Sequence, residues 1–294
     1  MIFNLIMQYG FVPDVWKTAI VVPIYKKGPA SNAKNYRPIS LTCIGSKMFE
    51  KIVKSHLMSH LQENGLLSKE QHGFLTKRST TANLLELTSD LSVNFNTRVS
   101  TLVAYVGLQK AFDKVSIAKL IHKIENWGIG GKLKSCISSV LTGRSQKVKV
   151  DGQLSDSLLL RSGVPQGGVL GPVIFTIYIN DLPTILPPSL KSKIHADDFK
   201  CYSKVVTADD LEIFSRALHN ISQWARDWQL PISTEKSALL LFSNSLELVG
   251  GRDLRLEKQM LTSLSRTLDL SVTFDSDLKF KSQISIVCGK AKQR

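Results

Sequence analysis

The stretch SKIHADDFKCY, residues 192–202, decides the fold because it places two carboxylates, Asp197 and Asp198, between segments that alternate like strands. The flanking Ile194 and Phe199 indicate a tight turn between two strands and not the start of a helix. Neighbouring carboxylates repel each other unless a cation or a proton separates them, and a site built only of oxygen ligands suits Mg²⁺. The sequence therefore predicts a hairpin with an acidic tip, which is either simply solvated or part of a metal site.

A second Ala-Asp-Asp, residues 208–210, shows how an acidic pair looks when helix capping explains it. Thr207 is a suitable N-cap, and Asp209 and Asp210 fall in the first helical turn, where the helix dipole favours negative charge. No such helix start surrounds Asp197, so the earlier pair needs a different explanation.

The composition indicates a folded chain with a polyanionic partner. The 294 residues are 43% hydrophobic, enough for a sizeable core, and the formal net charge is +14. Residues 17–78 hold eleven Lys and Arg against three Asp and Glu, so eight of these charges lie in the first quarter. This excess favours nucleic-acid binding, with a solvated basic face as the alternative.

The cysteines and the apolar segments predict an intracellular location, in the nucleus, the cytoplasm or both. The four cysteines are widely scattered and form no C-x-x-C pair, which favours reduced thiols. Residues 1–13 are apolar but lack a basic start and a small-residue cleavage site, so no secretion signal is expected. The longest uncharged run, 162–179, contains glycines and prolines that suit a membrane span poorly, so no membrane partner is expected.

Apolar periodicity predicts an α+β domain, with an antiparallel sheet covered on one face by helices. The expected strands are 18–27, 37–42, 100–106, a hairpin turning at Asp151 and Gly152, the pair in 193–205, and two late strands at 237–242 and 271–274. The expected helices are 46–61, 117–127, 133–141, one that begins near Pro172, and one that runs from Thr207 to Trp228.

Seven segments occur in an order that resembles the reverse transcriptases. Within that group the sequence resembles most closely the jockey-like, LINE-type retrotransposons that lack long terminal repeats. The segments are YRPISLT (36–42), QHGFLTKRSTTANLLEL (71–87), AYVGLQKAFDKV (104–115), GVPQGGVLGPVIFTIYINDLP (163–183), HADD (195–198), SQWARDWQLPISTEKS (222–237) and LDLSVTFDSDLKF (268–280). The resemblance covers nearly the whole chain.

This resemblance implies a right-hand polymerase fold, in which an antiparallel palm sheet is backed by helices and joined to a basic fingers subdomain. It assigns 1–98 to a fingers-like region, 99–275 to the palm with finger insertions at about 116–160, and 276–294 to the start of a truncated thumb or connection. The implied reaction is RNA-directed DNA synthesis from an RNA template, a DNA primer or target, and deoxynucleoside triphosphates. No protein partner is inferred.

In this family two Mg²⁺ ions, or Mn²⁺ as an alternative, lie roughly 3.5–4 Å apart and run the nucleotidyl transfer. Asp197 matches the family's metal-binding aspartate and Asp198 its acidic neighbour, while His195 stands where an aromatic residue is usual. The first metal-binding aspartate of the family is replaced by Gly107, in VGLQKAFDKV. Asp113 cannot take its place from an extended strand, because six residues at ~3.3 Å each span about 20 Å.

Further residues match nucleotide-binding positions of the family. Phe112 matches the aromatic that blocks a ribose 2′-hydroxyl, and a plain core phenylalanine is the alternative. Lys26 and Arg37 match fingers residues that meet the triphosphate, and ordinary surface charges are the alternative.

A glycine-rich loop and a lysine complete the expected nucleotide site. Gln166 and Gly167 match the loop against nucleotide and template, where glycine permits close backbone approach. A tight helix-entry turn would explain the same glycines. Lys236 matches a lysine near the triphosphate, with a charged loop as its alternative.

The sequence therefore leaves two functions open. One is an RNA-directed DNA polymerase core, and the other is a catalytically inactive nucleic-acid-binding remnant, because Gly107 supplies no carboxylate. A metal-dependent nuclease would need a third acidic residue near Asp197 and Asp198, and no spacing in the sequence offers one.

Overall fold

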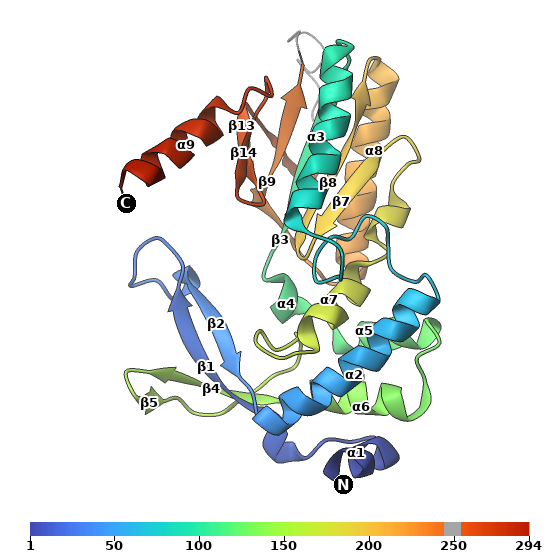
Figure 1. Cartoon of the computed structure of the whole chain (residues 1–294), viewed down its shortest axis with the longest axis vertical. Coiled ribbons are helices and arrows are strands. Elements are labelled where there is room, and N and C mark those ends of the chain that lie inside the picture. The colour runs from blue at the N-terminus through green and yellow to red at the C-terminus, as the bar shows by residue number, and fades with distance from the viewer. Residues whose placement is uncertain (244–253, 294) are drawn as a thin grey trace. The chain divides into compact units, whose positions relative to one another are not determined.

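The computed structural model describes residues 1–243 and 254–293, and the chain divides into two compact units (Figure 1). Unit 1 comprises Met1–Leu67 and Lys110–Ile179, and unit 2 comprises Ser68–Gln109 and Asn180–Arg294. Each unit is thus built from two separate stretches of sequence, and each is described by itself. The assignment of fingers, palm and thumb to consecutive stretches stays a prediction.

The sheet of unit 1 is built on a basic hairpin. Strand β1 (Thr18–Tyr25) pairs antiparallel with β2 (Tyr36–Leu41), as the sequence predicts, and parallel with β4 (Ser145–Val150). Strand β4 turns back into β5 (Gln153–Leu154), and β6 (Leu158–Leu159) also pairs with β4. The turn falls at Asp151 and Gly152, whose φ angles of 48° and 82° are typical of a tight hairpin turn.

The helices of unit 1 are amphipathic, apart from the last. They are α1 (Ile2–Tyr9), α2 (Ile44–Glu63), α4 (Ala111–Lys114), α5 (Ile117–Asn126), α6 (Gly131–Leu141) and α7 (Gly171–Ile179), with short 3₁₀ turns at Asp14–Trp16 and Ala33–Asn35. Helix α2 buries Phe49, Val53, Leu57 and Leu61, which recur every three or four residues. Every residue of α7 except Pro172 is buried, which explains why its sequence is apolar all round.

The main sheet of unit 2 has the strand order β12-β9-β3-β8-β7. Its central strand β3 (Ser100–Leu108) pairs antiparallel with β8 (Asp198–Val205) and with β9 (Ile232–Phe242). The edges are β7 (Lys191–His195), which is antiparallel to β8, and β12 (Thr262–Leu264), which is parallel to β9. The predicted hairpin around the acidic pair is therefore confirmed.

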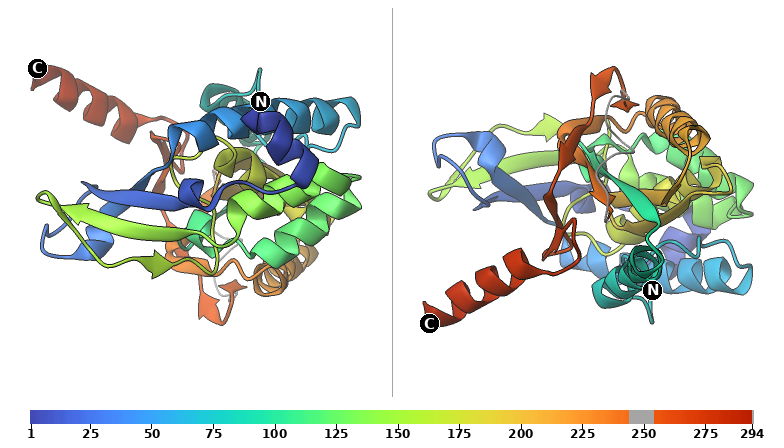
Figure 2. Two further views of the ribbon diagram at one scale, coloured as in Figure 1. Left: turned by 90° about the horizontal axis from the view of Figure 1, so that it is seen from below. Right: turned by 90° about the horizontal axis from the view of Figure 1, so that it is seen from above.

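Helices cover both faces of this sheet, and the expectation of a single covered face is wrong. Helix α3 (Thr80–Asn96) lies across one face and α8 (Ala208–Asp227) across the other (Figure 2). The reason is visible in β3, whose residues on both faces are almost all buried. Helix α8 begins with the predicted cap, because Thr207 Oγ1 accepts from Asp210 N while the Asp210 carboxylate accepts from Thr207 N.

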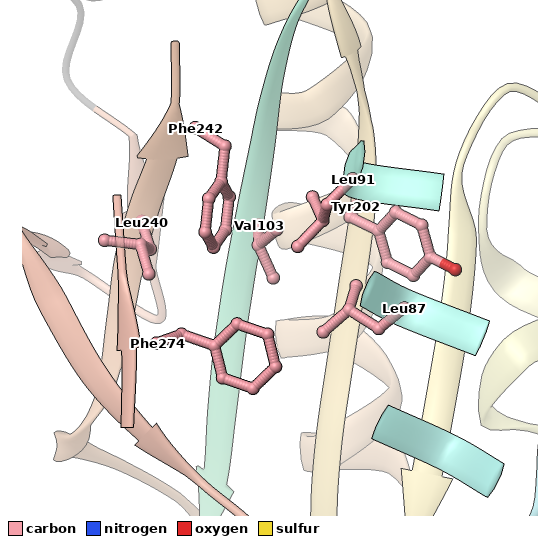
Figure 3. Close-up of a cluster of buried hydrophobic side chains, with 7 residues drawn as sticks. All are labelled: Leu87, Leu91, Val103, Tyr202, Leu240, Phe242 and Phe274. Carbon is pink, nitrogen blue, oxygen red and sulfur yellow. The ribbon is translucent and has the colours of Figure 1, made fainter. Parts of the chain in front are cut away.

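A hydrophobic cluster joins α3 to the sheet (Figure 3). Leu87 and Leu91 of α3 pack on the row formed by Val103 and Tyr202, which are cross-strand partners in β3 and β8. The cluster is completed by Leu240, Phe242 and Phe274. Leu87 and Leu91 are no more than 1% exposed. Their packing holds β3 and β8 together four residues away from the pair formed by Gly107 and Asp198.

The later part of unit 2 adds small hairpins and a terminal helix. The elements are a 3₁₀ turn at Leu182–Ile185, β10 (Arg255–Leu256), β11 (Gln259–Met260), β13 (Arg266–Asp269), β14 (Val272–Asp275) and α9 (Lys281–Lys292). Strands β13 and β14 form an antiparallel hairpin, and α9 packs against β14. In residues 1–243 and 254–293, no helix combines the length and the apolarity needed to cross a membrane.

Candidate active site

The acidic turn lies directly beside Gly107 in unit 2. Gly107 of β3 is the cross-strand partner of Asp198 in β8, and Asp198 is also paired with His195 across the turn. Asp197 sits in that two-residue turn, after Ala196 in the left-handed region at φ 55°. The motif alignment requires Gly107 and the acidic pair on neighbouring strands, and the structure places them there.

The QHG segment supports this turn from the side. Gln71 forms a parallel bridge with Ile194, and His72 N donates to Ile194 O at 2.8 Å. Gly73 follows, and a Cβ on it would lie 2.4 Å from Ala196 N, one residue before Asp197. The sequence identified this segment only as a motif, and nothing local in it indicated that it braces the acidic turn.

The electrostatics of the turn oppose ionisation of Asp198. Its side chain is open to solvent, but the surrounding protein displaces part of its hydration, and this loss is the main cause that raises the pKa of Asp198. Repulsion from Asp197 and then from Asp269 adds to the effect, while His195 and Lys200 act against it. A bound cation would relieve this repulsion.

A buried ion pair lies next to the turn. Lys200 follows Asp198 by two positions in β8, so both side chains project from the same face of the sheet. The Lys200 ammonium donates to the carboxylate of Asp269 in β13, and the two side chains are only 4% and 5% exposed. Burial lowers the pKa of Lys200 and raises that of Asp269, and each partner's charge opposes the shift of the other. No sequence pattern predicted this pair, because Asp269 lies in a distant hairpin.

Lys236 occupies the space above Gly107. The pairing of β3 with β9 shifts from Tyr105 opposite Ala238 to Gly107 opposite Ser233, so the residues between form a bulge. Gly107 N donates to Ser237 Oγ at 3.0 Å, which anchors the bulge. A Cβ on Gly107 would lie 2.6 Å from the Cβ of Lys236. The glycine therefore permits a close approach of β9 that any larger residue would obstruct.

The donor set of unit 2 does not fit a bridged pair of divalent ions. Asp197 and Asp198 offer adjacent carboxylates, but Gly107 has no oxygen side chain, and Asp269 is bonded to Lys200. Over the described ranges, no three or more His, Cys, Asp or Glu side chains are arranged to hold a metal ion.

The second group of predicted residues gathers around the glycine-rich loop of unit 1. Ser40 N donates to Gln166 O at 2.7 Å, and Gln166 Nε2 donates to Asp113 Oδ1 at 2.9 Å. Gly167 has φ 128°, and a Cβ on it would lie 2.4 Å from Ser40 O. Both a nucleotide loop and a tight turn require glycine here, so the geometry satisfies both explanations.

Glu50, which the sequence did not single out, holds the other end of this loop. Its carboxylate is 2% exposed and accepts from Ser46 Oγ at 2.9 Å, from Val169 N at 2.7 Å and from Leu170 N at 3.0 Å. These two backbone donors stand just before α7, where helix N–H groups have no internal partner. The sequence did contain a signal for this role, since Glu50 lies among the apolar residues of a predicted helix. A carboxylate that is buried in this way requires hydrogen-bond donors.

Phe112 lies beside the same loop. Its ring stacks on Phe175 with centroids 4.4 Å apart and planes inclined by 20°, and its carbonyl accepts from Val164 N at 2.8 Å. The residue is only half-buried. One face of the ring is thus part of the core of unit 1, while the remainder is accessible.

Lys26 and Arg37 lie on the hairpin of unit 1. Lys26 directly follows β1, and its backbone N donates to Asn35 O at 2.8 Å. Arg37 is paired with Ile24 in β2, and both basic residues are exposed. The structure therefore groups Phe112, Gln166 and Gly167 around one loop and leaves the two basic residues on the neighbouring hairpin.

The antiparallel sheet with its acidic hairpin is the arrangement of a right-hand polymerase fold. Residues 24–272 match the family described as reverse transcriptase (RNA-dependent DNA polymerase), and the chain belongs to this family. It is 27% identical to the probable RNA-directed DNA polymerase from transposon BS of Drosophila melanogaster, over 100% of this chain and 33% of that protein. It is 28% identical to the polymerase from mobile element jockey of the same species, over 93% and 31%. The chain thus spans about a third of the length of these relatives, and the predicted jockey-like resemblance is confirmed.

Solved structures confirm the fold. The chain superposes on apo telomerase from Candida tropicalis truncated from its C-terminal domain with a TM-score of 0.61 and 13% identity, over 95% of this chain and 58% of that one. A second apo telomerase structure from the same species gives 0.62 and 12%, over 95% and 52%. At such low identity the likeness concerns the fold alone.

Proposed function

We propose that this chain is the polymerase core of a retrotransposon protein, which engages an RNA template and a DNA primer or target and whose family reaction is RNA-directed DNA synthesis. The observation that carries the proposal is the acidic turn at Asp197 and Asp198, paired with β3 at the position where the family has its first aspartate. The net charge of +14 supports a nucleic-acid partner.

Residues of unit 1 match the family's nucleotide-binding positions and would meet the nucleotide. Lys26 and Arg37 would contact its phosphates, Gln166 and Gly167 would lie against it, and Phe112 would exclude a ribose 2′-hydroxyl. Lys236 would serve near the triphosphate. Mg²⁺ or Mn²⁺ would be the family's metal, held in part by Asp197 and Asp198.

A second candidate, an inactive nucleic-acid-binding remnant, is favoured by one specific observation. Gly107 supplies no metal ligand, and a side chain at 107 would begin only 2.6 Å from the Cβ of Lys236. The chain would then keep its binding surfaces while its synthesis is lost or strongly reduced.

Four free cysteines support action inside the cell, in the nucleus, the cytoplasm or both.

Primer extension on an RNA template, with Mg²⁺ and Mn²⁺ in separate reactions, separates the two candidates. We expect no extension by the wild type and partial recovery in Gly107→Asp. Asp197→Asn in that background is the control and should abolish the recovered activity.

Robust synthesis by the wild type would refute the remnant and support the polymerase. Failure of the wild type to bind an RNA–DNA duplex at low salt would contradict both candidates.

A further inference from the structure

A cavity of about 420 Å³ lies within unit 1, beside the loop of Gln166. Of the residues expected to meet the nucleotide, only Gln166 lines it, while Pro38 and Ser40 of β2, the strand that carries Arg37, form part of its wall. Its wall is partly apolar, with leucine, valine and proline side chains. The volume suits a small organic group and exceeds what a bare ion needs.

The charged groups of this cavity are almost all cations. Lys110, Lys114, Arg144 and Arg161 line it, against a single carboxylate, that of Asp113. One oxygen of Asp113 already accepts from Gln166 Nε2. Lys110, Lys114 and Arg161 are exposed, so their ammonium and guanidinium groups can move toward an entering anion.

Arg144 differs from the other three because it is buried, with 2% of its surface exposed. Its Nη1 donates to Val140 O at 3.0 Å, but its Nε and Nη2 find no acceptor among the residues that the structure describes. Burial lowers the pKa of Arg144, with only Glu50 acting in the other direction. A buried guanidinium with two unused donors is costly unless an acceptor reaches it.

Glu50 does not accept from Nε or Nη2 of Arg144 in the observed arrangement. Its Oε1 is used by Ser46, and its Oε2 by the backbone of Val169 and Leu170. No ion pair between Arg144 and a carboxylate occurs in the described part of the chain. The missing acceptor therefore has to come from outside the protein.

The number and type of the donors select the anion. A guanidinium fork binds two oxygens of a phosphate at once, and additional lysines neutralise the rest of its charge. A simple carboxylate would use fewer of the four cations, and a bare inorganic phosphate would leave the apolar wall unused. The chemistry that fits is a phosphate ester with a nucleoside attached.

We infer that the cavity lined by Lys114, Arg144 and Arg161 is a phosphate-binding site for a nucleic-acid strand or a nucleotide, distinct from the triphosphate contacts of Lys26 and Arg37. Arg144 supplies the fixed charge in the wall, and Lys110, Lys114 and Arg161 supply mobile charges at the entrance. The site deepens the proposed function by adding a phosphate contact next to Gln166.

The test compares two double variants with equal loss of charge. Lys114→Gln with Arg161→Gln alters the cavity, whereas Lys51→Gln with Lys132→Gln alters exposed lysines of the same unit outside it. Binding of a labelled single-stranded RNA oligonucleotide is measured by fluorescence anisotropy over a range of salt. We expect the cavity variant to bind about tenfold more weakly, with its salt slope reduced by about 0.7 for each lost phosphate contact, and the control to change less than about twofold.

Two further probes identify the source of the phosphate. If a strand occupies the cavity, deoxynucleoside triphosphate binding stays near that of the control while RNA binding falls; a nucleotide occupant gives the reverse. Inorganic pyrophosphate, measured by calorimetry, tests the cavity without any nucleic acid. Equal binding of RNA, triphosphate and pyrophosphate by the cavity variant and the control would overturn the inference.

Arg144 is tested through a conservative pair of variants, because it also donates to the last turn of α6 and its removal can unfold the unit. Arg144→Lys keeps the charge and should retain most phosphate binding, whereas Arg144→Met should lose it at least fivefold with the same far-UV circular dichroism. Equal binding by two folded variants would reduce Arg144 to a helix cap and contradict its assigned role. Wild-type protein that binds pyrophosphate through this cavity but no RNA would support the site while contradicting the proposed function.

Discussion

The loop around Gln166 and the acidic turn around Asp198 are stabilised in different ways. In the loop, backbone groups and the buried Glu50 satisfy one another, and Gly167 is required because a Cβ would meet the carbonyl of Ser40. Around Asp198, neighbouring carboxylates repel one another, and a Cβ on Gly107 would lie 2.6 Å from the Cβ of Lys236 and 3.3 Å from its carbonyl oxygen. The backbone therefore holds the loop of Gln166 in place, whereas the surroundings of Asp198 depend on side chains, which substitutions can change.

The largest expected effect falls on the buried ion pair beside Asp198. Lys200→Met leaves the Asp269 carboxylate buried without a partner, and loss of one member of such a pair typically costs about 3–5 kcal/mol. Lys204→Met, at an exposed position of the same strand, is the matched control and should change stability by less than about 0.5 kcal/mol. Urea unfolding measures both. If the two variants unfold at the same urea concentration, the ion pair between Lys200 and Asp269 does not stabilise the strands around Asp198.

Gly167→Ala tests whether backbone packing holds the loop. Its left-handed φ and the contact with Ser40 O should together cost about 3 kcal/mol. Gly152→Ala is the control, because it also has a positive φ of 82° but no atom within 4 Å of its Cβ, and strain alone should cost about 1 kcal/mol. Thermal unfolding of the two variants separates strain from contact. Equal losses would mean that the loop moves aside and is not fixed by Ser40.

Gly107→Ala tests whether the side chain of Lys236 is what excludes a larger residue at position 107. The alanine Cβ should cost about 1–2 kcal/mol, and Lys236→Gly should reduce this cost by about 1 kcal/mol. A double-mutant cycle in urea measures the coupling between the two positions. Additive effects would show that backbone, and not Lys236, excludes a side chain at 107, which would remove the contrast with Gly167.

The sequence predicts well whatever depends on neighbours along the chain. The strand pairs at 18–42 and 193–205, the turn at Asp151 and Gly152, and the Thr207 cap follow from local patterns and are confirmed. The long α3 was not predicted, although Leu84, Leu87 and Leu91 have helical spacing after the Ser79 cap. Its burial on the second face of the sheet depends on residues more than ten positions away.

The site was only partly predictable for the same reason. The motif order predicts the acidic pair and its place beside Gly107, because the resemblance puts these two motifs on adjacent strands, as β3 and β8 are here. The Lys200–Asp269 pair, the Glu50 brace and the contact of Gly73 with Ala196 join residues 69 to 123 positions apart. Such contacts are set by tertiary packing, and no periodicity reports them.

The smallest expected effect comes from removing the repulsion within the acidic turn. Because the folded protein raises the pKa of Asp198 above its unfolded value, it holds this proton more tightly, and ionisation of Asp198 lowers stability as pH rises through that interval. Asp198→Asn removes the charge, so the variant should be more stable than the wild type above the interval, with a Tm gain of less than about 2 °C. The gain should vanish at low pH, where Asp198 is protonated in both the folded and the unfolded state. Calorimetry between pH 3 and about pH 7 measures this difference in Tm between the variant and the wild type. A gain in Tm that does not depend on pH, or a loss at neutral pH, would show that favourable contacts hold Asp198, as they hold the loop around Gln166.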